Sequence, residues 1–159
     1  MKHLNTLMFL IYFIAIPLSG QTQKNISDKF YNISKRMRDI CYEMNQVPSP
    51  GRLDLSLLMS QERLLFENGL KLTALRIDHL GMDVFTLRRL KKHRVKDEIL
   101  LGLYRSEFAD TQKAIKEERA FLSRIASRAF GLSALEEESI SLLNEAEEAV
   151  GDGEKNLGL

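Results

Sequence analysis

The sequence predicts an all-α protein, built as three to four long antiparallel helices with coiled-coil character that form an extended bundle. Three observations lead to this prediction. After residue 26, apolar residues recur at helical steps of three and four positions; Leu, Glu, Lys, Arg and Ala are abundant; and no proline follows residue 50. No stretch alternates apolar and polar residues as a half-buried strand does. The chain of 159 residues is long enough for one domain with a buried core.

Residues 1–20 have the pattern of an export signal. Lys2 precedes an almost continuous apolar stretch from residue 7 to residue 18, and small residues follow, ending at Gly20. This stretch is shorter than the roughly 20 apolar residues that span a bilayer. We therefore expect a signal peptide cleaved after Gly20 and a mature protein that is secreted or periplasmic. An uncleaved signal anchor is the alternative, which Pro17 and the polar residues after it disfavour.

Residues 21–26 are expected to form a flexible N-terminus of the mature protein. Two Asn-x-Ser triplets begin at Asn25 and Asn32, and they would be N-glycosylation sites in a eukaryotic secretory pathway. Such triplets also arise often by chance. The Gly20-Gln21 junction is typical of export signals in some Gram-negative bacteria, so the sequence leaves a bacterial and a eukaryotic source open.

The helical domain is expected over residues 27–150, and its first helix runs from about Ser27, a suitable N-cap, to about Met44. Apolar residues at alternating steps of three and four form one seam on this helix. The residues of the seam are Phe30, Ile33, Met37, Ile40, Met44 and Val47. Two prolines within residues 48–51 end the helix, because proline lacks the amide donor of a helix interior.

A second helix is expected to begin near Asp54 or Ser56 and to continue to about Ile77. Its apolar residues lie on more than one face, which indicates contact with two neighbours. A break is expected at residues 80–83, where Gly81 can take the left-handed conformation that ends helices and Asp83 can cap the next one. The alternative is one helix over residues 54–130, more than about 100 Å long.

The third helix is expected over residues 84–130, and a further break near residues 131–133 separates it from the last helix. Ser133 and Glu136 have the spacing of a capping box, in which each side chain satisfies a free amide of the first turn. The last helix is expected over residues 134–150. Gly151 and Gly153 would stop it, and residues 151–159 would form a flexible tail.

Charge is balanced overall and uneven along the chain. Without the leader, 22 Lys and Arg face 22 Asp and Glu, so bulk charge predicts no partner. The densest basic cluster spans residues 88–96 and is a candidate site for an anionic ligand. Its cations are Arg88, Arg89, Lys91, Lys92, Arg94 and Lys96.

Three interpretations of this basic cluster remain open from the sequence. It can be an ordinary solvated helix face, or it can pair with acidic residues near the C-terminus, within or between chains. It can also bind lipid head groups or an acidic polysaccharide. Nucleic acid is disfavoured by the export signal and by the lack of aromatic residues among the cations. The acidic candidates are Glu136, Glu137, Glu138, Glu145, Glu147 and Glu148.

Cys41 is the only cysteine, so an intrachain disulfide is impossible. Because it lies beside the apolar seam, we expect it to be buried; a disulfide to a second chain is the alternative. Cys41 with His79 or His93 matches no catalytic pattern, and the two histidines have no metal-binding spacing. The sequence therefore predicts no catalytic residue, no metal site and no cofactor.

These observations favour an exported, non-enzymatic scaffold or adaptor that acts through helix–helix packing, with a protein partner or by self-association. Helices of unequal predicted length cannot cover one another end to end, so some apolar surface should remain for a partner. One alternative is a helical component of a bacterial envelope secretion or conjugation machine. The other is a peripheral binder of an anionic membrane surface or polymer, which would use residues 88–96.

Overall fold

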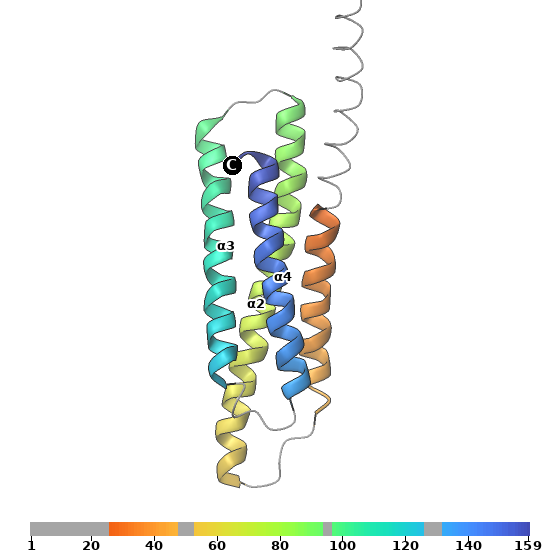
Figure 1. Ribbon diagram of the computed structural model, residues 1–159, viewed down its shortest axis with the longest axis vertical. Helices are drawn as coiled ribbons and strands as arrows, with labels where there is room; N and C mark the ends of the chain where they lie inside the picture. The colour runs from red at the N-terminus through yellow and green to blue at the C-terminus, as the bar shows by residue number, and fades with distance from the viewer. Residues whose placement is uncertain (1–25, 48–52, 94–96, 126–131) are drawn as a thin grey trace, which may run out of the picture.

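Figure 1 shows a computed structural model of the chain, which describes residues 26–47, 53–93, 97–125 and 132–159. These residues form four helical segments and no strand, which confirms the predicted all-α bundle. Residues 26–44 are helical and are followed by three further helices, each antiparallel to the one before it (Figure 1). The bounds of these three are Leu53–Lys92 for α2, Glu98–Ile125 for α3 and Ser133–Leu157 for α4.

Several predictions fall outside the described residues. They are the signal peptide over residues 1–20, the segment before Ile26 with Asn25, the break at residues 48–51 and the first part of the break near 131–133. Ile26 itself is helical and buried, so the expected flexible segment over residues 21–26 is wrong at its last position. Asn32 lies at an exposed position of the first helix.

The predicted seam of the first helix is confirmed. Its residues from Phe30 to Met44 are buried in the core, and Val47 packs partly buried against it. The other three helices complete this core with large side chains, since a helix is stable in water chiefly when its apolar face is covered. The largest of these are Phe66, Leu70, Ile77, Leu80 and Leu87 from α2, and Phe108 and Ile115 from α3.

The break expected at residues 80–83 is wrong, because α2 continues through this segment to Lys92. Gly81 lies inside the helix, buried where the first helix packs on α2, and a Cβ atom there would make only ordinary van der Waals contacts. A Cβ atom on Gly81 would lie 3.7 Å from the Cβ of Phe30. The Ser27 hydroxyl donates a hydrogen bond to the Gly81 carbonyl oxygen at 3.3 Å. Gly81 therefore does not end α2, and its carbonyl is a point of contact with the first helix.

The single helix over residues 54–130 and the third helix over residues 84–130 are also wrong, because the chain turns between Lys92 and Glu98. Asp97 caps α3. One of its carboxylate oxygens accepts hydrogen bonds from the amides of Ile99 at 3.0 Å and Leu100 at 3.1 Å. An aspartate at this position satisfies amides that have no partner within the helix. The capping residue was visible in the sequence, but the basic residues before it give no sign that a helix ends.

The start of α4 at Ser133 agrees with the predicted boundary, but the capping box is wrong. Leu132 occupies the N-cap position, and no side chain caps the helix. The Glu136 amide donates to the Leu132 carbonyl at 2.9 Å, while the Glu136 side chain is turned into the bundle, where the residue is 1% exposed. Contact with the other helices therefore decided the direction of this side chain.

The flexible tail expected over residues 151–159 is wrong as well, because α4 continues to Leu157, which is fully buried. Gly158 ends the helix with a positive φ of 61°. Gly153 lies inside the helix against two buried aromatic rings: a Cβ atom there would lie 3.0 Å from Phe108 Cε1 and 3.3 Å from Phe30 Cζ. The glycine that was expected to stop α4 instead lets the helix pack closely on these rings.

Candidate protein-binding surface

The outer face of α2 carries a row of exposed residues at coiled-coil spacing. From Gln61 to Arg89 the row advances by alternating steps of four and three residues, and every member is exposed. Its four apolar members are between 57% and 62% exposed. We call this row the α2 outer stripe; its members are Gln61, Leu65, Asn68, Leu72, Leu75, His79, Met82, Thr86 and Arg89.

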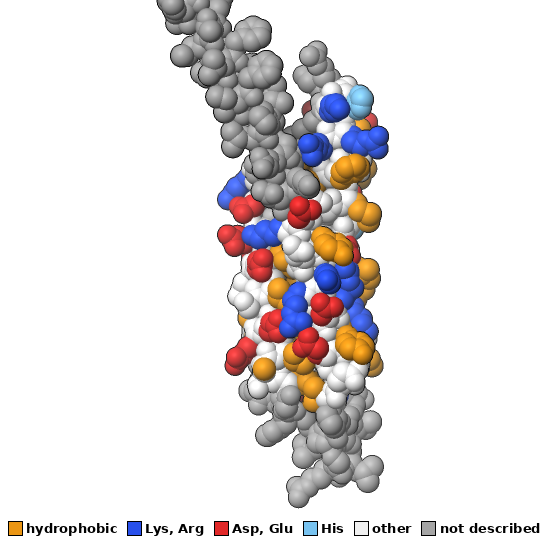
Figure 2. Space-filling view, turned by 90° about the vertical axis from the view of Figure 1, so that its right-hand side faces the viewer, with side chains coloured by type: hydrophobic (Ala, Val, Ile, Leu, Met, Phe, Trp, Pro, Cys, Tyr) orange, Lys and Arg blue, Asp and Glu red, His pale blue; other side chains and the backbone are white. Residues whose placement is uncertain are grey.

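The stripe differs from the buried face of the same helix, which includes Phe66, Leu70 and Ile77. Helix α2 therefore has two apolar faces, one in the bundle core and one in solvent. The sequence predicts apolar residues on more than one face of this helix and contact with two neighbours. Among the described residues, the bundle covers one of these faces, and no helix lies over the other. Figure 2, which shows the side of residues 26–44, has hydrophobic side chains along its length among charged ones.

A groove of about 640 Å³ adjoins the stripe where α2 meets the first helix. The exposed side chains of Met82 and Phe85 line its α2 side, and Ser27 and Tyr31 line the other side. Asp78 lies at the groove and is held in place, because it accepts a hydrogen bond from Ser34 and pairs with Arg38. The surface thus has a fixed polar group beside exposed apolar ones.

The basic cluster lies at the end of α2. Arg88, Arg89 and Lys92 are exposed and form no ion pair within the described chain. The Arg89 guanidinium lies 5.9 Å from the centre of the Phe85 ring, a cation–π contact. Arg94, Lys96 and the side chain of Lys91 fall outside the described part of the structure.

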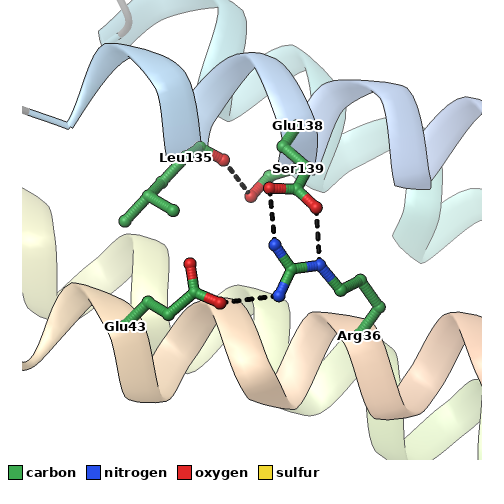
Figure 3. Close-up of polar contacts among 5 residues, drawn as sticks. All are labelled: Arg36, Glu43, Leu135, Glu138 and Ser139. Carbon is green, nitrogen blue, oxygen red and sulfur yellow. Dashed lines mark hydrogen bonds and ion pairs between the residues drawn. The ribbon is translucent and has the colours of Figure 1, made fainter.

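Two of the acidic residues of α4, Glu138 and Glu147, pair with cations that lie outside the basic cluster. Arg36 on the first helix binds Glu138 through two hydrogen bonds of 2.5 and 2.8 Å, and it also binds Glu43 at 2.6 Å (Figure 3). These carboxylates raise the pKa of Arg36 above its ordinary value. Arg119 and Lys116 of α3 pair with Glu147. The ion pairs of Glu138 and Glu147 therefore link α4 to the first helix and to α3. None of them involves the described cations at the end of α2.

Cys41 is buried, as expected, with 1% of its surface exposed. Its thiol donates a hydrogen bond to the Glu67 carbonyl oxygen at 3.6 Å. Burial, and next the nearby Glu67 carboxylate, raise the pKa of Cys41 to about 11. The alternative of an intermolecular disulfide at Cys41 would require the bundle to open. The pairing of Cys41 with His79 or His93 is also absent, because both histidines are exposed on α2 or just after it.

We expect native Cys41 to react about 100-fold more slowly with iodoacetamide at mildly alkaline pH than the same thiol in the unfolded chain, because the thiolate is the reacting form. Mass spectrometry of timed samples, with and without denaturant, measures both rates. Fast labelling of the native protein, or a disulfide-linked dimer in the absence of reductant, would contradict this result.

His79, Asp83 and Glu107 form a polar cluster between α2 and α3 that the sequence did not reveal. One nitrogen of His79 lies 3.0 Å from Glu107 and 3.7 Å from Asp83, and one candidate ligand atom from each residue lies within 4.8 Å of the others. These groups are of the kind that hold a divalent metal. A histidine–carboxylate ion pair accounts for the same contacts, since His79 and Glu107 are about half exposed, and we assign no metal site here.

Three carboxyl groups of the interior have buried oxygen atoms without a hydrogen-bond partner: Asp83, Glu118 and Glu136. Burial raises the pKa of each, and for Glu118 the pKa rises to about 7. The Glu118 carboxyl lies over the backbone of Gly69, where a Cβ atom would come within 2.1 Å of it. These groups are dispersed along the bundle, so they do not form one site.

Comparisons with protein-family models, with curated proteins and with solved structures produced no match to this chain. Among the described helices, none has the length and the apolar character needed to cross a bilayer. The proposals below therefore rest on the residues and contacts of the chain itself.

Proposed function

We propose that this protein is an exported, non-enzymatic helical adaptor or scaffold, and that it binds another helix along the α2 outer stripe. The observation that supports this most directly is the exposed heptad spacing of Leu65, Leu72, Leu75 and Met82. Single exposed apolar residues are common on protein surfaces, but these four recur on one helix face at steps of seven, three and seven residues, the heptad spacing of positions that a partner helix covers in a coiled coil.

The energetic argument agrees with this proposal. Full burial of a Leu or Met side chain stabilises a complex by about 1.5–3 kcal/mol, and four such side chains are available on the stripe. Asn68 and His79 interrupt the apolar row. Polar residues at such positions lower affinity but fix the register and the partner of a helix pair. The stripe thus combines an apolar row with groups that select one arrangement.

The place of action in this proposal comes from the leader pattern of residues 1–20, which is typical of secreted or periplasmic proteins. A role in a bacterial envelope machine would use the same surface. Binding of an anionic membrane or polymer has less support, because the exposed cations Arg88, Arg89 and Lys92 are also what a solvated helix end presents.

Photo-crosslinking in the exporting cell tests the proposal. We expect benzoylphenylalanine in place of Leu75 to yield one defined cross-linked product, and we expect Leu72→Glu to reduce its amount at least about tenfold, because a charge then lies in the apolar row. Leu103 is the matched control position, since this α3 residue is 63% exposed and lies outside the stripe.

Comparison of positions 75 and 103 distinguishes a specific binding surface on α2 from random contact. A product at position 75 that depends on Leu72, with little product at position 103, supports a binding surface on α2. Equal products at both positions, or none at position 75, would overturn the proposal. Mass spectrometry of the product identifies what lies on the stripe.

A further inference from the structure

We propose that the helix bound along the α2 outer stripe is α2 of a second copy of this chain, running antiparallel, so that two copies form a twofold-symmetric dimer. This inference rests on the proposed function and names its partner. In a twofold interface the same surface of each copy must be complementary to itself. The stripe meets this condition in one register.

In that register, the numbers of stripe residues that lie opposite each other add up to 147, and those of flanking residues add up to 149 on one side of the stripe and to 145 on the other. Leu72 then faces Leu75 of the second copy, and Leu65 faces its Met82. The polar members also meet: Asn68 faces His79 of the second copy, and amide and imidazole groups can form a hydrogen bond. Each contact occurs twice because of the symmetry. From Gln61 to Thr86, every apolar member of the stripe therefore meets an apolar member and every polar member a polar one, while Arg89 lies beyond these pairs.

The residues that flank the stripe on the side of the first helix agree with the same register. They are Leu64, Lys71, Asp78 and Phe85, again spaced by seven. Lys71 lies opposite Asp78 of the second copy, so a cation meets a carboxylate twice, in addition to the pairs that Lys71 forms with Glu67 and Asp78 with Arg38 within each chain. Leu64 lies opposite Phe85, and both are more than half exposed in the single chain. Flanking charges of this kind set the orientation of paired helices.

Other arrangements of the same two helices bring like charges together. In a parallel pair, Lys71 would flank Arg76 of the second copy, and both residues are exposed. An antiparallel pair shifted by one heptad would place either two Lys71 or two Asp78 side chains opposite each other. Like charges in contact oppose association, so the flanking residues select the antiparallel register in which Lys71 meets Asp78.

One contact of the favoured register lies on the side of α3, where Glu62 comes opposite Asp83 of the second copy. Asp83 is buried between α2 and α3, 3.7 Å from the His79 imidazole, so it lies back from the surface that the second copy covers. Arg76, the other residue on this side, lies opposite Gly69 and meets no charge. The stripe from Gln61 to Arg89 is about 40 Å long, so the interface extends along most of the bundle.

Disulfide pairing between two different variants tests both partner and register. We expect the exported form of Asn68→Cys, mixed with that of His79→Cys under mild oxidation, to yield a disulfide-linked heterodimer. Neither variant alone should yield such a product, because residue 68 faces residue 79 and not itself. Native Cys41 is buried and does not interfere. Leu103→Cys mixed with His79→Cys is the control for random collision.

Each other outcome has a defined meaning. A linked homodimer from Asn68→Cys alone, with no 68–79 heterodimer in the mixture, would overturn the register, because a parallel pair places residue 68 opposite itself. Absence of any product beyond the collision control would overturn the dimer.

Sedimentation equilibrium of the unmodified chain provides the second measurement. We expect a monomer–dimer equilibrium, and a dissociation constant weakened at least about 100-fold by Leu72→Glu, because twofold symmetry places two carboxylates at the centre of the interface. A strict monomer would overturn the dimer. If photo-crosslinking at position 75 then identified a different protein, the proposed adaptor function would stand. Only the inference that the partner is a second copy of this chain would be excluded.

Discussion

Gly153→Val is expected to lower the free energy of unfolding by about 3 kcal/mol, since it adds volume to a filled core. A Cβ atom at this position lies 3.0 Å from Phe108 and 3.3 Å from Phe30, and both rings are fully buried. Neither ring can move without displacing its own neighbours in the core. Urea unfolding followed by circular dichroism measures the change.

Gly102→Val is the matched control for this prediction. Gly102 is an exposed residue of α3, and a Cβ atom there meets no atom within 4 Å. Because valine favours a helix slightly more than glycine does, we expect an unchanged or slightly higher stability, within about 0.5 kcal/mol. Equal losses of stability in both variants would show that helix propensity, rather than packing on Phe30 and Phe108, governs position 153.

Glu118→Gln is expected to stabilise the protein by about 1–2 kcal/mol at mildly alkaline pH and to have little effect at acidic pH. Burial raises the pKa of Glu118 to about 7 from an ordinary value of 4.5. A pKa shift corresponds to about 1.4 kcal/mol per unit, and we reduce the resulting figure because the side chain is partly exposed.

The sign of the pH dependence follows from linkage. The fold favours the protonated form of Glu118, so its contribution to stability is complete below its unfolded pKa of 4.5 and is lost as the pH rises through about 7. Stability should therefore fall between pH 4.5 and 7 and remain low above that range. Asp83 and Glu136, whose pKa values are also raised by burial, act in the same direction. The glutamine variant should show a smaller fall.

Urea unfolding at a series of pH values checks this prediction with two further variants. Glu117→Gln is the control, because the side chain of this neighbouring glutamate is 69% exposed. Gly69→Ala should reduce the pH dependence as Glu118→Gln does, because its Cβ would displace the Glu118 carboxyl toward solvent. If Glu118→Gln and Glu117→Gln had the same pH profile as the unmodified chain, Glu118 would be a solvated carboxylate.

The local sequence is sufficient to predict that the chain forms helices and to predict the buried face of the first helix. The seam from Phe30 to Met44 was predicted residue by residue, because the period of a helix alone determines which side chains share a face. Burial of Cys41 followed from its place beside that seam. The candidate site was predicted only in outline: the sequence indicated two apolar faces on α2, but which face the bundle covers depends on how the first helix and α3 pack.

The sequence by itself determined that the chain is helical, where apolar faces lie and that it carries an export pattern. Only the tertiary structure decided which glycines end a helix. Gly81 and Gly153 lie inside helices and Gly158 ends one. A glycine disfavours a helix interior by about 1 kcal/mol, and at Gly153 the close packing on Phe30 and Phe108 offsets this cost. Tertiary packing likewise turned Glu136 inward and left the α2 outer stripe exposed, since burial depends on neighbours that are distant in the sequence.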